Sequence, residues 1–97
     1  MLKSSSLEYI RAIAKKYEAE KVLLFGSCLT KSMDKANDID LAVYGLCKSK
    51  HWDMYMELSY ADELDDMPVD LLRAEDDAPL MVFAREGLPI YERKNSE

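Results

Sequence analysis

Two aspartates separated by a single residue, Asp38-Ile39-Asp40, open an alternating stretch of the sequence that predicts a strand. Alternate residues of a strand project from the same face, with Cα atoms about 6–7 Å apart. Two carboxylates placed there repel each other unless a cation lies between them. Hard oxygen ligands suit magnesium, which also takes up substrate phosphate oxygens. Asp38 and Asp40 are therefore candidate metal ligands, and the alternative is an exposed strand face that meets water.

A third carboxylate, Asp70, stands inside the apolar segment Pro68-Val69-Asp70-Leu71-Leu72. An acidic side chain in such a segment needs an explanation, because burying it without a partner is costly. A metal site shared with Asp38 and Asp40 is one explanation. A hydrogen-bonded or edge-facing aspartate is the other.

A glycine and a serine, Gly26 and Ser27, follow the continuously apolar run 22–25. Glycine lets a backbone approach a bulky anion closely, and the free N–H groups of a helix that starts at Ser27 would face that anion. Alone, the pair also fits an ordinary turn and helix cap. Together with three carboxylates it provides a phosphate cradle and the ligands for a two-metal displacement at phosphorus.

A small set of helices and strands must position these residues. The spacing of apolar residues and of turn and cap signals predicts helices over residues 6–18 and 51–64 and from Asp77 to Gly87. It predicts strands over residues 22–25, 38–44, 69–72 and 88–92, the last placed at a sheet edge by Pro89. Ser5 and Glu8 fit a capping box at the first helix. We predict an α/β (α+β) fold, a small mixed sheet with helices packed on it, in a single domain over residues 1–97.

The second predicted helix carries Trp52, Tyr55, Met56 and Ser59 on one face. This spacing fits a core face or a stripe that contacts a partner. The possible edge strand at 88–92 also allows a homodimer through strand pairing.

The composition limits the kinds of molecule that the chain is expected to bind. Acidic residues outnumber basic ones by 19 to 13, giving a net charge of -6 over 97 residues. This balance argues against direct nucleic-acid binding and against an anionic membrane surface. Two cysteines do not form a disulfide framework, and the apolar runs are too short for a signal peptide or a membrane span, so we expect a cytoplasmic protein.

The segments that carry these residues resemble a known family. Leu24-Phe25-Gly26-Ser27, then Asp38-Ile39-Asp40-Leu41-Ala42-Val43, then Val69-Asp70-Leu71-Leu72 resemble the minimal nucleotidyltransferase (MNT) domains of the DNA polymerase beta-like superfamily. The resemblance implies Mg²⁺, two ions, and ATP as the substrate that supplies a nucleotidyl group to an acceptor hydroxyl. It implies that Gly26 and Ser27 contact the triphosphate and that Asp38, Asp40 and Asp70 serve as metal ligands and catalytic carboxylates.

Domains of this size resemble the antitoxins of HEPN–MNT toxin–antitoxin pairs. The implied partner is a HEPN-domain toxin, which would form a hetero-oligomer with this chain. The implied reaction adds AMP to a tyrosine hydroxyl of the toxin. Two alternatives are a binding module that neutralises the partner by contact alone and an enzyme that modifies a small molecule.

The sequence departs from the family pattern beside the serine. Cys28 stands where the family often has arginine, and Lys31 stands where it often has glycine. We hypothesise that Lys31, four residues after Ser27 and therefore on the same side of a helical turn, supplies the missing positive charge to the nucleotide. The alternative is an exposed lysine on a surface helix.

Overall fold

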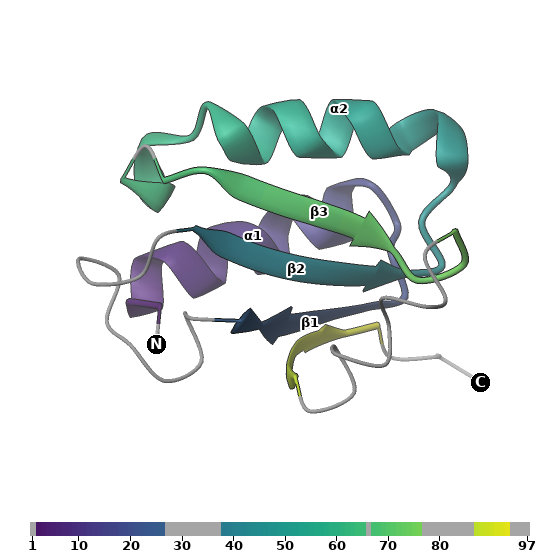
Figure 1. The fold of residues 1–97 in the computed structure, drawn as a ribbon, viewed down its shortest axis with the longest axis horizontal. Coiled ribbons are helices and arrows are strands. Elements are labelled where there is room, and N and C mark those ends of the chain that lie inside the picture. Colours follow the sequence, from purple (N-terminus) through teal and green to yellow (C-terminus); the bar gives the residue numbers. More distant parts are fainter. Residues whose placement is uncertain (1, 27–37, 66, 77–86, 94–97) are drawn as a thin grey trace.

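The computed structural model describes residues 2–26, 38–65, 67–76 and 87–93 (Figure 1). Its elements are α1 (Ser4–Lys16), β1 (Lys21–Phe25), β2 (Ile39–Tyr44), α2 (Lys48–Ser59), the 3₁₀ turn η2 (Asp62–Leu64), β3 (Val69–Arg73) and β4 (Leu88–Glu92).

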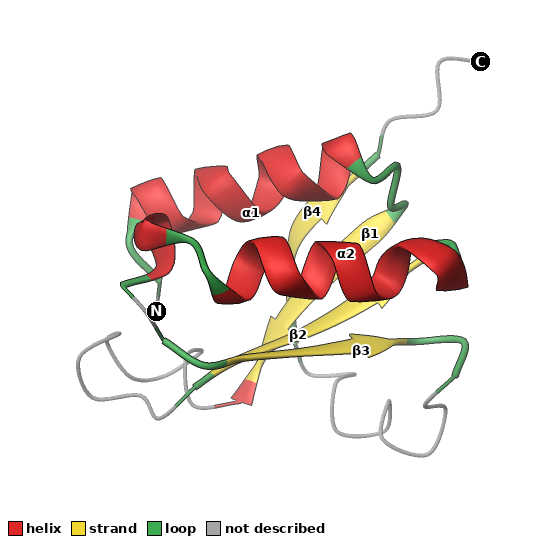
Figure 2. Cartoon of the chain, turned by 90° about the horizontal axis from the view of Figure 1, so that it is seen from above, coloured by secondary structure: helices red, strands yellow, loops and turns green. Residues whose placement is uncertain are grey.

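The strands form one mixed sheet in the order β3-β2-β1-β4. Strand β1 runs antiparallel to both of its neighbours, whereas β2 and β3 are parallel. Helices α1 and α2 lie side by side over the same face of the sheet (Figure 2). The predicted architecture, a small mixed sheet with helices packed on it, is confirmed.

The core lies between the helices and the sheet. Ile39, Leu41 and Val43 of β2 point into it and are fully buried, as their alternation predicts. The helices contribute apolar side chains at helical spacing: Ile10, Ile13 and Ala14 from α1, and Met54 and Leu58 from α2. Burying a large aliphatic side chain stabilises a fold by about 1.5–3 kcal/mol. This layer therefore determines which side chains of each strand point toward the helices and which point to the opposite face of the sheet.

The start of α1 differs from the prediction. The helix begins at Ser4 after Lys3, which makes no side-chain capping bond, so the capping box of Ser5 and Glu8 is wrong. The Ser6 hydroxyl instead donates a 2.6 Å hydrogen bond to the carbonyl oxygen of Glu63. A tertiary contact therefore holds the start of the helix where a local cap was expected.

Helix α2 also differs in extent and in its buried face. It spans Lys48–Ser59, and Asp62–Leu64 forms a separate 3₁₀ turn, where the prediction had one helix over 51–64. Met54 and Leu58 face the core, while Trp52 is 64% exposed. Of the two alternatives for this face, the core face is therefore wrong for Trp52, although half-buried Tyr55 packs against the core. Met54 and Leu58, which are smaller and one turn apart, fill the space above the sheet.

Strand β4 lies at one edge of the sheet, as Pro89 predicts. The helix predicted from Asp77 to Gly87 lies almost entirely outside the described residues. Neither α1 nor α2, the two α-helices of the described part, has the length and apolar character of a transmembrane helix.

Candidate metal site

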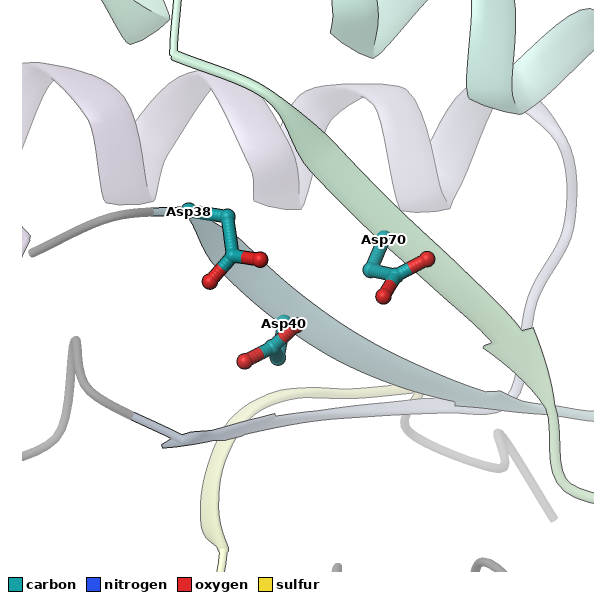
Figure 3. Close-up of side chains that lie close together, drawn as sticks. All are labelled: Asp38, Asp40 and Asp70. Atoms are coloured by element: carbon teal, nitrogen blue, oxygen red, sulfur yellow. The ribbon is translucent and has the colours of Figure 1, made fainter.

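The three predicted carboxylates meet on the sheet face opposite the helices (Figure 3). Parallel pairing of β2 and β3 sets Asp40 beside Asp70. Asp38, two residues before Asp40, shares its face of the strand. Each residue offers one carboxylate oxygen to a group in which these ligand atoms all lie within 4.8 Å of one another. The structure thus brings together residues from two separate segments that the sequence only suggested would meet.

Burial of the neighbouring residues fixes this orientation. Ile39 and Leu41 flank Asp40 on β2 and are fully buried on the helix side, and Val69 and Leu71 flank Asp70 in the same way on β3. Because side chains alternate along a strand, a shift of one residue in either strand would turn its carboxylate into the core. The apolar alternation therefore holds the acids on the open face.

The site is electrostatically strained without a cation. Asp40 is half-buried, and its pKa is raised by burial first and then by the negative charges of Asp38 and Asp70. A divalent cation would remove this repulsion, and carboxylate oxygens are the ligands that magnesium prefers. The donor set and its close spacing therefore fit a magnesium-type ion.

Gly26 brings the end of β1 to the same site. It follows Phe25, whose register partner on β2 is Asp40. Its φ is 77°, a left-handed conformation that favours glycine. A Cβ built at Gly26 would overlap the carboxylate of Asp40. The sequence suggested Gly26 only for its approach to a phosphate. Its second role, leaving room for Asp40, depends on strand register and had no signal in the sequence.

The remaining predicted nucleotide contacts, Ser27 and Lys31, lie outside the described residues, as does Cys28. Of the predicted site residues, the structure therefore places Gly26, Asp38, Asp40 and Asp70, and it places all four together.

A family model described as polymerase beta, nucleotidyltransferase, matches residues 8–96 of the chain. This match agrees with the resemblance carried by the sequence motifs and spans every residue of the candidate site.

Solved structures share the fold. A chain of the crystal structure of the toxin–antitoxin pair MntA–HpeT, in a mutant with two aspartates changed to glutamate, superposes with a TM-score of 0.69 at 19% identity, over 91% of this chain and 74% of that one. A chain of a structure described as tri-AMPylated Shewanella oneidensis HEPN toxin in complex with MNT antitoxin gives a TM-score of 0.66 at 20% identity, over 91% and 71%. No curated protein matches the sequence.

Proposed function

The chain belongs to the polymerase beta nucleotidyltransferase family, and from this premise we propose that it is an antitoxin that transfers AMP from ATP to a partner protein. The acceptor is a hydroxyl group, that of a tyrosine, on a HEPN-domain toxin in the cytoplasm. The whole chain, residues 1–97, acts as one minimal nucleotidyltransferase domain.

The convergence of Asp38, Asp40 and Asp70 is the observation that carries this proposal. A structural role does not explain three carboxylates whose ligand oxygens lie within 4.8 Å of one another, because their mutual repulsion costs stability. Phosphoryl-group transfer does explain them, since its catalysis consists mainly of positioning and of electrostatic stabilisation.

Asp38, Asp40 and Asp70 would hold two magnesium ions, which supply charge neutralisation on the triphosphate and stabilise the attacking and leaving oxygens. The half-buried position of Asp40 beside two other acids makes the ionised site receptive to cations.

The protein's own groups orient the reactants. The acceptor oxygen attacks the α-phosphorus of ATP and forms a new O–P bond. The bond between the α-phosphorus and the oxygen that bridges to the β-phosphate breaks, and pyrophosphate leaves. The hydroxyl proton passes to a carboxylate oxygen of Asp70. This residue is suited to that role because it is the exposed member of the three acids and therefore the one that an incoming side chain reaches.

The triphosphate lies along the backbone after β1. Gly26 permits its close approach, the Ser27 hydroxyl donates a hydrogen bond to it, and Lys31 supplies positive charge. In this chain Lys31 takes the place of the arginine that the family often has at position 28.

Two relatives with the same fold support the choice of partner. One is a chain of a toxin–antitoxin complex, and the other belongs to a complex whose HEPN toxin is tri-AMPylated.

A second candidate function is neutralisation of the partner by binding alone. The presence of Cys28 in place of the usual arginine favours it, because loss of that charge weakens the hold on a triphosphate.

The experiment that separates the two functions is intact-mass spectrometry of a purified HEPN-domain partner incubated with this protein, ATP and Mg²⁺. We expect mass increments of one AMP each with the wild type and none with Asp38→Ala/Asp40→Ala. A stable complex without any added mass for the wild type would refute AMP transfer and support the binding-only function.

A further inference from the structure

Of the three carboxylates of the candidate site, Asp70 has the least support from the sheet. Asp40 lies in β2 and Asp38 directly before it, and β2 pairs with a strand on each side. Asp70 lies in β3, an edge strand that pairs with β2 alone. A strand with one neighbour is held by one ladder of hydrogen bonds, so its position depends more on contacts from other elements.

The ladder between β2 and β3 shows which backbone groups face the outer edge. At its start the Pro68 carbonyl oxygen accepts a 2.9 Å hydrogen bond from the N–H of Ile39, and at its end the Ala74 N–H donates a 2.9 Å hydrogen bond to Val43. In a parallel pair, every second residue of a strand turns its backbone groups toward the same neighbour. Even-numbered residues of this segment therefore face β2, and the carbonyl group of Leu71 faces the outer edge.

His51 of α2 reaches that carbonyl group. Its Nε2 lies 2.7 Å from the carbonyl oxygen of Leu71. A carbonyl oxygen only accepts hydrogen bonds, so Nε2 carries the proton and donates it. Helix α2 lies alongside β3 (Figures 1 and 2), and Leu71 directly follows Asp70 in the sequence. The contact therefore ties the edge strand to the helix layer one residue away from Asp70.

Leu71 is held in two directions at once. Its side chain is buried in the core, at right angles to the sheet, and its carbonyl group is held at the outer edge by His51. With the ladder to β2 on the inner side, these contacts fix the rotation of β3 about its own axis. That rotation sets the direction in which the Asp70 side chain projects. A displacement of about 1 Å at a reacting group can slow a reaction about 10²-fold.

We propose that His51 is a positioning residue for Asp70. Its hydrogen bond to the Leu71 carbonyl oxygen holds the edge strand so that the Asp70 carboxylate meets the cation and the acceptor hydroxyl. The role of Asp70 in the reaction rests on the proposed function. His51 belongs to the helix layer, and the carboxylates lie on the opposite face of the sheet. It therefore acts through the strand and does not touch the reactants.

The other edge of the sheet offers a matched control. Arg11 of α1 donates a 2.6 Å hydrogen bond from Nε to the carbonyl oxygen of Ile90 in β4, the second edge strand. None of the predicted site residues lies in β4. Arg11→Ala thus removes the same kind of contact, between a helix side chain and an edge-strand carbonyl group, without touching the strand that carries Asp70.

The first test is steady-state AMP transfer to a purified HEPN-domain partner, at saturating Mg²⁺ and below the melting transition of every variant. We expect His51→Ala to lower kcat about tenfold while the KM for ATP stays unchanged. His51→Gln should recover most of the rate, because its amide N–H donates to the same carbonyl oxygen. Arg11→Ala should keep the wild-type kcat. A wild-type kcat in His51→Ala, or an equal loss in Arg11→Ala, would overturn the proposal.

A double-mutant cycle shows whether His51 acts through Asp70. In an Asp70→Asn background, His51→Ala should cause no further loss of rate, because the residue that it positions is no longer a carboxylate. A further loss of about tenfold in that background would mean that His51 affects the reaction by another route, and the positioning role would be wrong.

Two readouts on the free chain do not depend on AMP transfer. In metal-free buffer, His51→Ala should speed hydrogen exchange of the β3 amides, and Arg11→Ala that of the β4 amides. Added Mg²⁺ should raise the Tm of His51→Ala less than that of Arg11→Ala. Wild-type rates of exchange in β3 together with an undiminished effect of Mg²⁺ in His51→Ala would overturn the proposal. If the wild type binds the partner without transferring AMP, the enzymatic function is wrong, and these two readouts alone uphold or overturn the role of His51.

Discussion

Gly26 and Gly45 follow strands β1 and β2 with similar left-handed φ angles, 77° and 71°. At both positions an added Cβ would overlap an acidic side chain, that of Asp40 at Gly26 and that of Glu20 at Gly45. The two glycines therefore share the same backbone requirement, but only Gly26 borders the three carboxylates. This makes Gly45 a matched control for the role of Gly26.

We predict that Gly26→Ala and Gly45→Ala each lower the free energy of unfolding by roughly 1–2 kcal/mol, because both place a Cβ at positive φ. Only Gly26→Ala should also slow AMP transfer, by about 10²-fold, since it displaces Asp40 from the cation site. Thermal melts and transfer rates measured on the same samples check this. Equal losses of activity in both variants would show that Gly26 matters only for folding.

Asp40 is expected to lower the stability of the folded chain when no cation is bound, because its carboxylate lies half-buried beside two other acids. Its pKa in the folded chain is raised above 3.8, so its favourable contribution belongs to the protonated form and is lost as the pH rises through the raised pKa. At neutral pH without a divalent cation, Asp40→Asn should therefore stabilise the chain by on the order of 1 kcal/mol. Melting curves in EDTA test this prediction, and added Mg²⁺ should stabilise the wild type more than the variant. A variant that melts below the wild type in EDTA would contradict the electrostatic account.

The sequence predicts the site residues better than it predicts their arrangement. Asp38 and Asp40 follow from alternation within one segment, which is a local property. The proximity of Asp70 depends on β3 lying beside β2 in parallel, with 29 residues between Asp40 and Asp70 in the sequence. Nothing local in the sequence specifies that strand order, and the family resemblance was needed to place the third carboxylate.

At the scale of elements, Glu57 joins the two helices. Lys16 and Tyr17 of α1 donate hydrogen bonds to its carboxylate, and the phenol of Tyr9 lies 3.4 Å from its carbonyl oxygen. The hydrogen bond from Lys16, followed by that from Tyr17, lowers the pKa of Glu57 below 4.5. The pair of helices is therefore held together more strongly when Glu57 is ionised.

This predicts a pH dependence of stability. A depressed pKa contributes stability above the unfolded value of about 4.5, and this contribution is lost as the pH falls through the folded pKa. Glu57→Gln should lower the Tm by a few degrees at pH 7 and have a smaller effect below about pH 4. Melts of both proteins from pH 3 to pH 7 measure this, and a constant difference across that range would count against the ionised contact.

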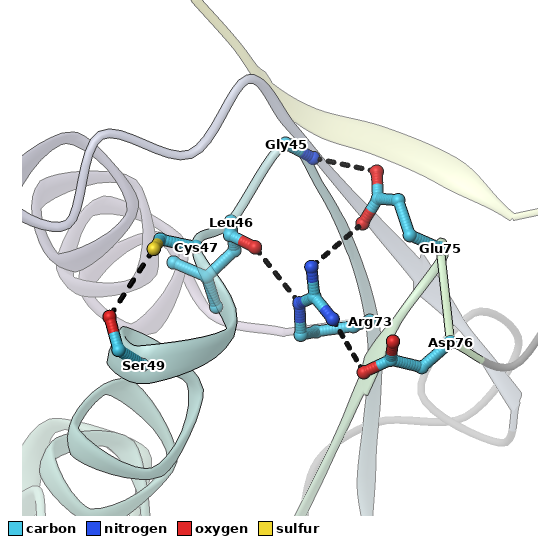
Figure 4. A network of polar contacts seen from close by, with 7 residues as sticks. All are labelled: Gly45, Leu46, Cys47, Ser49, Arg73, Glu75 and Asp76. Carbon is cyan, nitrogen blue, oxygen red and sulfur yellow. Dashed lines mark hydrogen bonds and ion pairs between the residues drawn. The ribbon is translucent and has the colours of Figure 1, made fainter.

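Arg73 forms a network of polar contacts at the C-terminal end of β3 (Figure 4). Its Nε donates a 2.9 Å hydrogen bond to the carbonyl oxygen of Leu46, and its Nη1 lies 2.6 Å from the Asp76 carboxylate. Glu75 lies 3.9 Å from Nη2 and accepts a 3.0 Å hydrogen bond from the Gly45 N–H. The network links β3 to the connection between β2 and α2, at the opposite end of the strands from the carboxylates.

Because lysine cannot reproduce this planar fork, Arg73→Lys should lower the Tm measurably. It should leave the AMP-transfer rate unchanged at a temperature where the variant is fully folded. Differential scanning fluorimetry and the transfer assay at 20 °C below the variant's Tm give the two readouts. A slower transfer rate under those conditions would extend the functional site to this end of the sheet.

Elements whose pattern is set by burial were predicted well, and those set by tertiary contacts were not. The strand at Val22 follows from a continuously apolar run, and the strand at Ile39 follows from alternation of apolar and polar residues. The predicted cap of Ser5 and Glu8 does not form, and the Ser6 hydroxyl instead donates a hydrogen bond to the carbonyl oxygen of Glu63 in the distant 3₁₀ turn. On α2 the spacing of Trp52 and Tyr55 left a core face and a partner-contacting stripe open, and the sheet below accommodates Met54 and Leu58 in place of Trp52.

At the scale of the whole molecule, one side chain from each helix contacts an edge strand of the sheet. Arg11 of α1 donates a 2.6 Å hydrogen bond to the carbonyl oxygen of Ile90 in β4. His51 of α2 contacts the carbonyl oxygen of Leu71 in β3. Each contact engages one carbonyl oxygen of its strand. The strand-paired homodimer that the sequence allows stays a prediction.

The most direct test of the central claim, that Asp38, Asp40 and Asp70 form the centre that transfers AMP, is the transfer rate of single Asp→Asn variants. Each is measured against the wild type with one HEPN-domain partner, ATP and Mg²⁺. Each substitution removes a charge and keeps the side-chain shape, so all three variants should bind the partner while transferring AMP at least about 10²-fold more slowly. Transfer at the wild-type rate by any of the three would contradict the assignment of that residue to the site.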